Sequence, residues 1–310
     1  MSVKVHQLNK RYGSFPAVRD VTFEVPSGGI FGFVGPNGAG KTTTLRILAG
    51  LLAPTSGEAW VGGESVIQRP RAVRQKVGYM PDFFGVYGDL TVVEYLDFYA
   101  HSHGVARSHR QRVIDDLIEL VDLVDKRQAF VNTLSRGMKQ RLGLARCLVH
   151  DPEVLLLDEP ASGLDPRARV EMREILRELQ KMGKTILVSS HILPELADLC
   201  THLGIVNHGQ MLVHGPVADV LAQAEVGQSV VIRVLERAEA VADHLRQRPG
   251  VSRVEVGSEG VVADLTGDDG DVAALLRSLV EAGLPVVEFR KRSRGLEELF
   301  LEVTGEQEGA

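Results

Sequence analysis

The spacing of hydrophobic and polar positions predicts strands at the beginning of the chain. Residues 3–8 alternate between apolar and polar side chains, and residues 18–25 have the pattern of a second short strand. The apolar run GIFGFVG at residues 29–35 is typical of a buried strand. It leads through a glycine-rich turn into the helical pattern TTTLRILAGLL at residues 42–52. We therefore expect β structure first, followed by a strand, a loop and a helix.

Helical and strand patterns alternate through the middle of the chain. From residue 91 to about 124 the apolar positions recur at helical spacing, which predicts a helical insertion. A second helix is predicted to end at Asp151-Pro152, before the run VLLLD at residues 154–158, which reads as a buried parallel strand. A helix over residues 166–181 and the strand TILVSS complete a βαβ unit. The core is therefore predicted to be α/β.

The pattern changes after about residue 227. The order becomes strand SVVIRVL, helix AEAVADHLRQR, strand SRVEV, strand GVVADL, helix DVAALLRSLVEAG and strand PVVEFRK. This βαββαβ order predicts a small α+β, ferredoxin-like C-terminal domain over residues 228–310. The amphipathic stretch at residues 295–303 is expected to cap it, and the tail GEQEGA to be frayed. A regulatory ligand sensor and a dimerisation or packing module both fit such a domain.

Composition narrows the classes of function. A chain of 310 residues suits one large and one small domain, and its net charge of -6 gives no broad positive field for nucleic acid. Cys147 and Cys200 form no CxxC or metal-ligand cluster, and no secretory leader precedes Val3, so a reducing cytoplasm is expected. The longest apolar runs end well before the roughly 20 residues that a spanning helix needs. Any membrane role therefore requires another chain.

The segment GPNGAGKT at residues 35–42 matches the phosphate-loop pattern GxxxxGK[ST]. Its glycines allow backbone amides to close around phosphate oxygens, and the following helix adds the positive end of its dipole. Lys41 can reach the β and γ phosphates, and Thr42 can offer its hydroxyl to Mg²⁺. Because the segment falls between a strand and a helix, a merely structural glycine turn is the weaker interpretation. The predicted ATP-binding residues here are Gly35, Pro36, Asn37, Gly38, Ala39, Gly40, Lys41, Thr42 and Thr43.

The run VLLLDEP places two carboxylates at the end of a buried strand. Asp158 can hold Mg²⁺ as in the Walker-B arrangement, and Glu159 can orient or deprotonate an attacking water. Two acids that cap the following turn are the alternative. The presence of a phosphate loop in the same chain favours the catalytic interpretation, in which Glu159 and Lys41 both act in hydrolysis.

The segment LSRGMKQRLGLARCLVHDPEVLLLDEPASGLDP, residues 134–166, resembles the signature, Walker B and D-loop of ABC transporters. The resemblance covers residues 1 to about 222. It implies a P-loop NTPase ABC cassette over residues 1–224, with a mixed core sheet, an antiparallel N-terminal β region and a helical subdomain at about 88–150. It also implies an ATPase that uses ATP and Mg²⁺, pairs as a homodimer and drives transmembrane transport.

The resemblance assigns roles to five further residues. Ser135 and Gly137 would contact the γ phosphate bound by the opposite copy, although Ser135 alone is more often a helix cap. His191 matches the switch histidine that contacts the γ phosphate, and Asp165 matches the D-loop, where it also suits a helix start. Tyr12 stands where the family stacks an aromatic ring on adenine, the alternative being a Tyr packed on the first sheet.

Three positions, in two segments, depart from the family pattern. Asp82 stands where the family often has a Gln that touches Mg²⁺ and water; a carboxylate can bind the metal but repels the γ phosphate. In the signature, Arg136 replaces a glycine and Met138 a glutamine. Arg136 can pair with phosphate or project into solvent.

The segment at residues 83–98 is rich in aromatic side chains. In the family this region forms the groove for a helix of the membrane subunit, though half of these residues suit a local core better. They are Phe83, Phe84, Tyr87, Tyr95 and Phe98.

The stretches at residues 78–96 and 294–305 resemble ABC-2 exporters. The resemblance implies a polytopic permease as partner and a cytoplasmic location on the inner face of the cell membrane. The alternative is a soluble ABC-type ATPase acting on nucleic acid or ribosomes. One cassette with a short helical insert disfavours it, so no nucleic-acid partner is expected.

Overall fold

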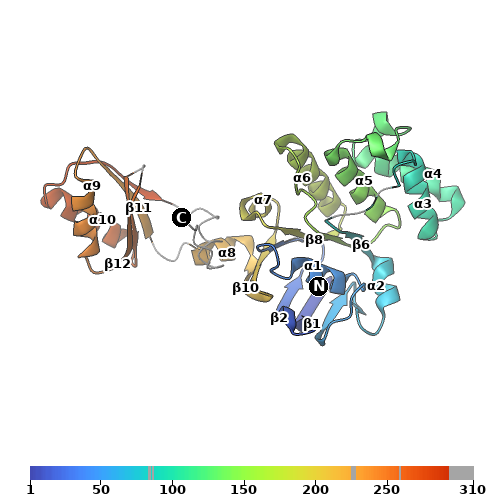
Figure 1. The fold of residues 1–310 in the computed structure, drawn as a ribbon, viewed down its shortest axis with the longest axis horizontal. Coiled ribbons are helices and arrows are strands. Elements are labelled where there is room, and N and C mark those ends of the chain that lie inside the picture. Colours follow the sequence, from blue (N-terminus) through green and yellow to red (C-terminus); the bar gives the residue numbers. More distant parts are fainter. Residues whose placement is uncertain (83–84, 86, 225–227, 258–259, 293–310) are drawn as a thin grey trace. The chain divides into compact units, whose positions relative to one another are not determined.

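The chain divides into two compact units, Met1–Val217 and Ala218–Ala310, which are described separately. The structure, a computed structural model, describes residues 1–82, 85, 87–224, 228–257 and 260–292 (Figure 1). We expected the cassette to run to residue 224, whereas this division assigns nearly all of α8 (Val217–Ala224) to the second unit. The amphipathic stretch at 295–303 and the tail lie outside the described residues.

An antiparallel sheet forms one layer of the first unit. It contains β1 (Val3–Tyr12), β2 (Phe15–Val25), β4 (Ser56–Val61) and β5 (Glu64–Ser65), in the order β2-β1-β4-β5. The two predicted N-terminal strands are present, and both extend beyond the alternating segments because they pair along their length as a hairpin.

The central sheet of the first unit has six strands in the order β10-β9-β3-β8-β7-β6. They are β3 (Ile30–Val34), β6 (Val77–Met80), β7 (Val154–Leu157), β8 (Thr185–Ser190), β9 (His202–Asn207) and β10 (Gln210–Pro216). Only β10 runs antiparallel to its neighbour. Strands β3, β7 and β8 are buried throughout, which explains why their sequences show apolar runs instead of alternation.

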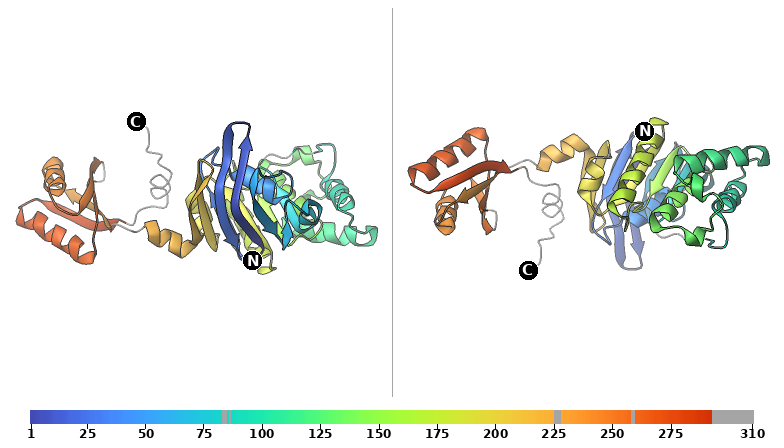
Figure 2. Two further views of the ribbon diagram at one scale, coloured as in Figure 1. Left: turned by 90° about the horizontal axis from the view of Figure 1, so that it is seen from below. Right: turned by 90° about the horizontal axis from the view of Figure 1, so that it is seen from above.

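Helices fill the space between the sheets and cover the far face. The apolar side of α1 (Lys41–Leu48) packs into the core that joins both sheets, together with Phe23, Phe31 and Phe33. On the opposite side of the central sheet lies α6 (Pro166–Lys181), as the two views of Figure 2 show. The short helices α2 (Pro70–Lys76) and α7 (Leu193–Ala197) follow β5 and β8.

The predicted helical insertion is confirmed. It consists of α3 (Val92–Ser102) and α4 (Arg107–Leu120), two 3-10 turns (Val124–Lys126 and Val131–Thr133), and α5 (Arg136–Leu148), grouped beside the core (Figure 1). Thr91 and Glu94 form a capping box that fixes where α3 begins. Within the described part of the chain, no helix combines the length and apolar character that crossing a membrane would require.

The second unit has the predicted βαββαβ order. Its elements are β11 (Gln228–Val234), α9 (Ala238–Arg246), β12 (Val251–Gly257), β13 (Gly260–Leu265), α10 (Asp269–Glu281) and β14 (Val286–Arg292). The antiparallel sheet has the order β12-β13-β11-β14, which is ferredoxin-like. Apolar residues of α9 and α10 pack on one face of this sheet and form a separate core.

Candidate functional site

Four neighbouring parallel strands bring the predicted chemical residues to one edge of the central sheet. β3 ends before the phosphate loop, β8 before His191, β7 before Asp158, and β6 before Asp82. These strands are adjacent in the order β3-β8-β7-β6 and run in the same direction. The residues that follow them therefore meet where open α/β sheets bind their ligands.

Close backbone contacts hold the phosphate loop in shape. A Cβ added to Gly35 would lie 2.3 Å from the carbonyl oxygen of Val206, and one on Gly40 would lie 2.5 Å from that of Ala17. Gly40 also has a φ of 100°, which L residues rarely adopt. Helix α1 begins after Gly40 without a side-chain cap, so the amides of its first turn are suited to bind an anion.

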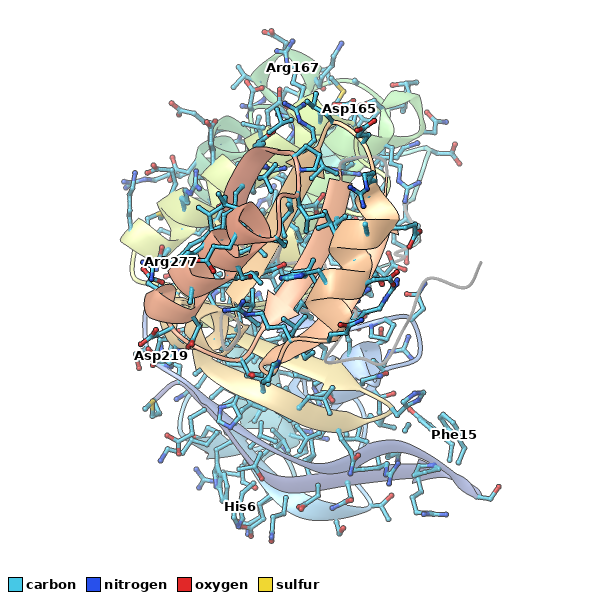
Figure 3. The ribbon with its side chains drawn as sticks, turned by 90° about the vertical axis from the view of Figure 1, so that its left-hand side faces the viewer. His6, Phe15, Asp165, Arg167, Asp219 and Arg277 are labelled. Carbon is cyan, nitrogen blue, oxygen red and sulfur yellow. The ribbon has the colours of Figure 1, made fainter. Side chains whose placement is uncertain are left out.

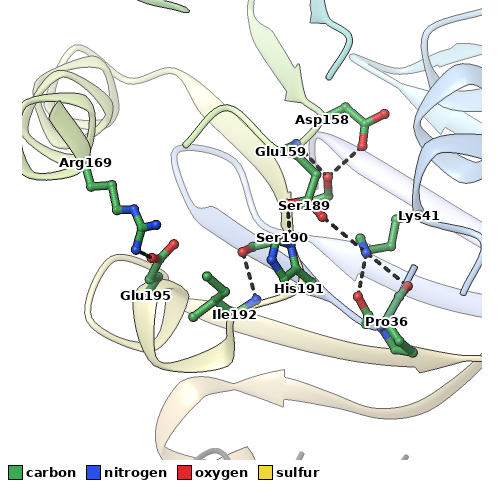
Figure 4. Close-up of polar contacts among 11 residues, drawn as sticks. Pro36, Lys41, Asp158, Glu159, Arg169, Ser189, Ser190, His191, Ile192 and Glu195 are labelled. Carbon is green, nitrogen blue, oxygen red and sulfur yellow. Dashed lines mark hydrogen bonds and ion pairs between the residues drawn. The ribbon is translucent and has the colours of Figure 1, made fainter. Parts of the chain in front are cut away.

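The ammonium group of Lys41 lies at the centre of the cluster (Figure 4). Its Nζ donates to the carbonyl oxygens of Gly35 at 2.5 Å and Pro36 at 3.1 Å. It also forms an ion pair with Glu159, 3.2 Å from Oε1. Both side chains are largely buried, so this charge contact is poorly screened by solvent. The phosphate-loop cation and the predicted catalytic carboxylate are therefore in direct contact in this chain.

Glu159 also contacts the predicted switch histidine. His191 Nδ1 lies 2.9 Å from Glu159 Oε2 and donates a hydrogen bond to it, because a carboxylate can only accept. Glu159 has a φ of 51°, in the left-handed region that favours glycine. Strained backbone of this kind is common at functional sites, because the surrounding structure must hold the side chain where chemistry needs it.

Asp158 lies beside this pair, and a hydrogen bond from Ser189 holds its side chain in place. Ser189 Oγ donates to Asp158 Oδ1 at 2.8 Å and accepts from the backbone amide of Glu159 at 3.0 Å. Burial raises the pKa of Asp158, and hydrogen bonding by Ser189 and Thr42 lowers it. The negative charges of Glu159 and Asp82 raise this pKa further. Sequence reasoning missed Ser189, although a serine in the buried strand TILVSS was a signal for a polar partner inside the core.

The second carboxylate oxygen of Asp158 is suited to receive a cation. This Oδ2 atom is buried and has no hydrogen-bond partner of good geometry in the described part of the chain. An unpartnered buried carboxylate oxygen is costly, and carboxylates are preferred ligands of Mg²⁺. Thr42 is close enough to lower the pKa of Asp158, and the exposed Asp82 is close enough to raise it. The three residues predicted to hold the metal therefore share one neighbourhood.

The signature and the D-loop form a second group of residues. Ser135 caps α5 by accepting from the amide of Met138 at 3.3 Å, and Asp165 caps α6 by accepting from the amide of Ala168 at 2.9 Å. A Cβ on Gly137 would lie 3.1 Å from the Cβ of Ala168, so the two helices begin close together. No hydrogen bond or ion pair among the described residues joins these caps to the Lys41 cluster.

Two features of this group bear on the sequence predictions. The guanidinium of Arg136 lies against Gly163, where an added Cβ would be 2.3 Å from Cζ. Arg136 therefore contacts the D-loop of its own chain, an arrangement that sequence reasoning did not consider. Asp165 and Arg167 lie exposed at the beginning of α6 (Figure 3).

An exposed aromatic pair lies at the turn between β1 and β2. Tyr12 is opposite Phe15 in the strand register, and both rings are exposed. Lys10 Nζ lies 5.4 Å from the centre of the Tyr12 ring. Tyr12 is therefore not packed in the first sheet, and Phe15 is a second aromatic ring that the sequence reasoning did not single out.

Comparison with known proteins identifies the family. The family described as "ABC transporter" matches residues 18–162. The chain is 36% identical to the Nod factor export ATP-binding protein I of Paraburkholderia xenovorans (strain LB400), over 99% of this chain and 98% of that protein. The chain is an ABC transporter ATP-binding protein. A second relative of this ABC protein, at 35% identity over 98% of the chain and 97% of the relative, is the bacitracin transport ATP-binding protein BcrA of Bacillus licheniformis.

Solved structures of ABC cassettes share the fold. An ATP-binding subunit of an ABC transporter is 30% identical and matches with a TM-score of 0.65, covering 72% of this chain and 93% of its own. A cassette solved as a dimer with ADP and Pi, 23% identical, matches with a TM-score of 0.63 over 69% of this chain and 98% of its own. The chain is thus an ABC cassette of the exporter type, an ATPase whose turnover is coupled to transport.

Proposed function

We propose that this chain is the ATP-hydrolysing subunit of an ABC-2 type exporter and works as a homodimer on a separate polytopic permease. The observation that carries the proposal is the contact of Lys41 with Glu159, and of Glu159 with His191, beside a buried carboxylate at the mouth of a phosphate loop. The named relatives transport different compounds, a Nod factor and bacitracin. The transported substrate is therefore expected to be selected by the permease.

ATP would bind with its phosphates on the loop at residues 35–43. Lys41 is the main point charge for the β and γ phosphates. To bind them, its ammonium group must break its ion pair with Glu159 or contact Glu159 and the phosphates together. The exposed rings of Tyr12 and Phe15 offer flat faces for the base. Stacking requires only such a face, so discrimination between adenine and guanine is expected to be weak. Replacing Tyr12 by Phe should therefore preserve ATP affinity, and replacing it by Ala should reduce it.

The residues around Asp158 fit Mg²⁺. Thr42 and Asp158 would hold the ion, with Asp82 as an exposed second carboxylate. When bound, Mg²⁺ would neutralise phosphate charge. Ser189 fixes the orientation of Asp158 and leaves its second oxygen for the metal.

Hydrolysis would use Glu159 as the base for water, with His191 as its partner. The two side chains are already within hydrogen-bond distance, the contact by which a partner side chain orients a base. His191 orients the carboxylate and can contact the terminal phosphate. Lys41 supplies positive charge where negative charge develops.

A homodimer would complete each nucleotide site. Ser135 and Gly137 belong to the start of α5, whose helix dipole favours an anion, yet no described contact joins them to Lys41 in the same chain. An isologous pair would place the start of α5 from one copy on the phosphates held by the other. Asp165, exposed at the start of α6, would lie in the same interface. Cleavage of the γ phosphate would then release the two copies.

Exposed aromatic residues of the helical insertion would meet the permease on the inner face of the cell membrane. Tyr87 and Phe98 are exposed and make an edge-to-face contact at 5.4 Å, whereas Tyr95 is fully buried in the local core. Phe83 and Phe84 lie outside the described residues. An exposed aromatic pair is a suitable anchor for a helix of a partner chain.

The test is co-purification combined with turnover. We expect the tagged chain to bind ATP, to release phosphate, and to capture a polytopic membrane protein, which the adjacent reading frame should encode with about six hydrophobic spans. A purified chain that neither binds ATP nor associates with a membrane protein would refute the proposal. Stimulation of its turnover by RNA or DNA would favour an ATPase acting on nucleic acid instead.

A further inference from the structure

Arg169 joins two segments that flank the proposed catalytic pair. From α6 its Nε donates to the carbonyl oxygen of Leu164 at 3.0 Å. Its Nη1 donates to Glu195 Oε1 on α7 at 2.6 Å (Figure 4). A guanidinium is a rigid planar fork, so using it at both ends sets the distance between the two groups that it binds.

The first of these segments is the loop that leaves Glu159. The amide of Ser162 donates to the carbonyl oxygen of Glu159 at 3.0 Å, and the amide of Leu164 donates to that of Ala161 at 3.3 Å. Two successive turns therefore connect the backbone of Glu159 to Leu164, whose own carbonyl oxygen is the acceptor for Arg169. A shift of this loop would be transmitted to the guanidinium.

The second segment begins at His191. Helix α7 starts two residues later, at Leu193, and Glu195 lies in its first turn. His191 in turn contacts Glu159 at 2.9 Å. The contacts thus form a closed ring, from Glu159 through the loop to Arg169, then through Glu195 and His191 back to Glu159.

The ion pair acts where apolar packing is incomplete. A cavity of about 410 Å³ lies among α6, the end of β8 and α7. Its apolar lining includes Met172, Leu176, Val188, Leu196 and Leu199. Helix α7 has only five residues, and its buried Leu193 and Leu196 pack into the core while its other side borders this cavity. Across the cavity, the contact between Arg169 and Glu195 adds a polar constraint on the distance between α7 and α6.

We propose that Arg169 is a positioning residue for ATP hydrolysis. Arg169 holds α7 at the distance from α6 that allows His191 to contact Glu159. Because Arg169 also binds Leu164, the contact between His191 and Glu159 depends on the conformation of the loop at residues 160–165. The inference rests on the roles proposed above for Glu159 and His191. It predicts an effect on turnover with little effect on nucleotide binding, because Arg169 has no described contact with the phosphate loop.

The test compares single substitutions in the full-length chain. Arg169→Gln and Glu195→Gln should each lower kcat about tenfold while KM for ATP stays within about twofold, since a small displacement of catalytic groups slows chemistry more than binding. Combining the two substitutions should lower kcat no further than either alone. Arg173→Gln is the matched control, because Arg173 lies one turn along α6 and lines the same cavity, with no ion pair among the described residues. It should retain wild-type kcat.

A second experiment separates this inference from the proposed function. His191→Ala should lower kcat, and adding Arg169→Gln to it should produce no further loss, because the route through His191 is already gone. An equal further loss would overturn the inference, and so would wild-type kcat in Arg169→Gln or in Glu195→Gln. Wild-type kcat in His191→Ala would instead remove the catalytic role proposed for His191. A lowered melting temperature with unchanged kcat would make Arg169 merely structural.

Discussion

Replacing Glu159 by Gln should strengthen ATP binding, because it frees Lys41. The carboxylate lies 3.2 Å from the ammonium, and the two side chains are 13% and 5% exposed. With an effective dielectric constant of about 20, the attraction at this distance is about 5 kcal/mol. Desolvation of the two charges offsets most of it, which leaves roughly 1–2 kcal/mol. If phosphate must draw Lys41 from this contact, removing the carboxylate should lower the Kd for ATP by about 5- to 30-fold.

The same substitution should abolish most turnover. Without a carboxylate at position 159 the base proposed for the attacking water is lost, so kcat should fall at least about 100-fold. Tight binding with slow hydrolysis should keep the closed dimer, which wild-type turnover would open. The variant should therefore elute as an ATP-dependent dimer in size-exclusion chromatography.

Calorimetric titration with ATP and phosphate release together check both parts. The control is Glu153→Gln, which makes the same change in charge at a side chain that is 64% exposed and 3.9 Å from Lys76. It should alter neither Kd nor kcat, because exposed ion pairs contribute little. Weaker ATP binding by Glu159→Gln would refute the competition for Lys41, and wild-type turnover would remove Glu159 as the base.

Three further predictions follow from other contacts. Lys41→Ala should weaken ATP binding at least about 30-fold in the same titration, because the phosphates lose their main point charge. In Gly40→Ala the added Cβ would lie 2.5 Å from a carbonyl oxygen, so urea denaturation should show a loss of about 2–3 kcal/mol in the free energy of unfolding. Gly38→Ala, where the added Cβ has open space, should lose only about 1 kcal/mol. The pKa of His150 is lowered from 6.5 to about 4, mainly by burial and to a smaller extent by the charge of His103. The unfolded chain therefore binds a proton at this imidazole more readily than the folded chain, so the free energy of unfolding falls as pH drops from 6.5 to 4. His150→Gln should reduce this pH-dependent loss by about 1 kcal/mol, a figure that allows for the partial exposure of the side chain.

The sequence by itself determined the elements and the kinds of chemistry. The phosphate loop, the acids at the end of VLLLD and the βαββαβ order are local patterns, in which neighbouring residues carry the whole signal. For that reason the α/β core, the helical insertion and the ferredoxin-like unit could all be predicted. The hairpin of β9 and β10 and the short helix α7 were not predicted, since their patterns are too short to be distinguished from loops.

Only the tertiary structure decided which of these residues touch. The order of the parallel strands brings Ser189 to Asp158 and Lys41 to Glu159, although more than a hundred residues separate the second pair in sequence. The left-handed backbone of Glu159 and the bridge from Arg169 to Glu195 likewise arise from how β7, β8 and α7 pack. Strand order depends on crossover connections and burial across the whole sheet, so no local window of sequence contains it.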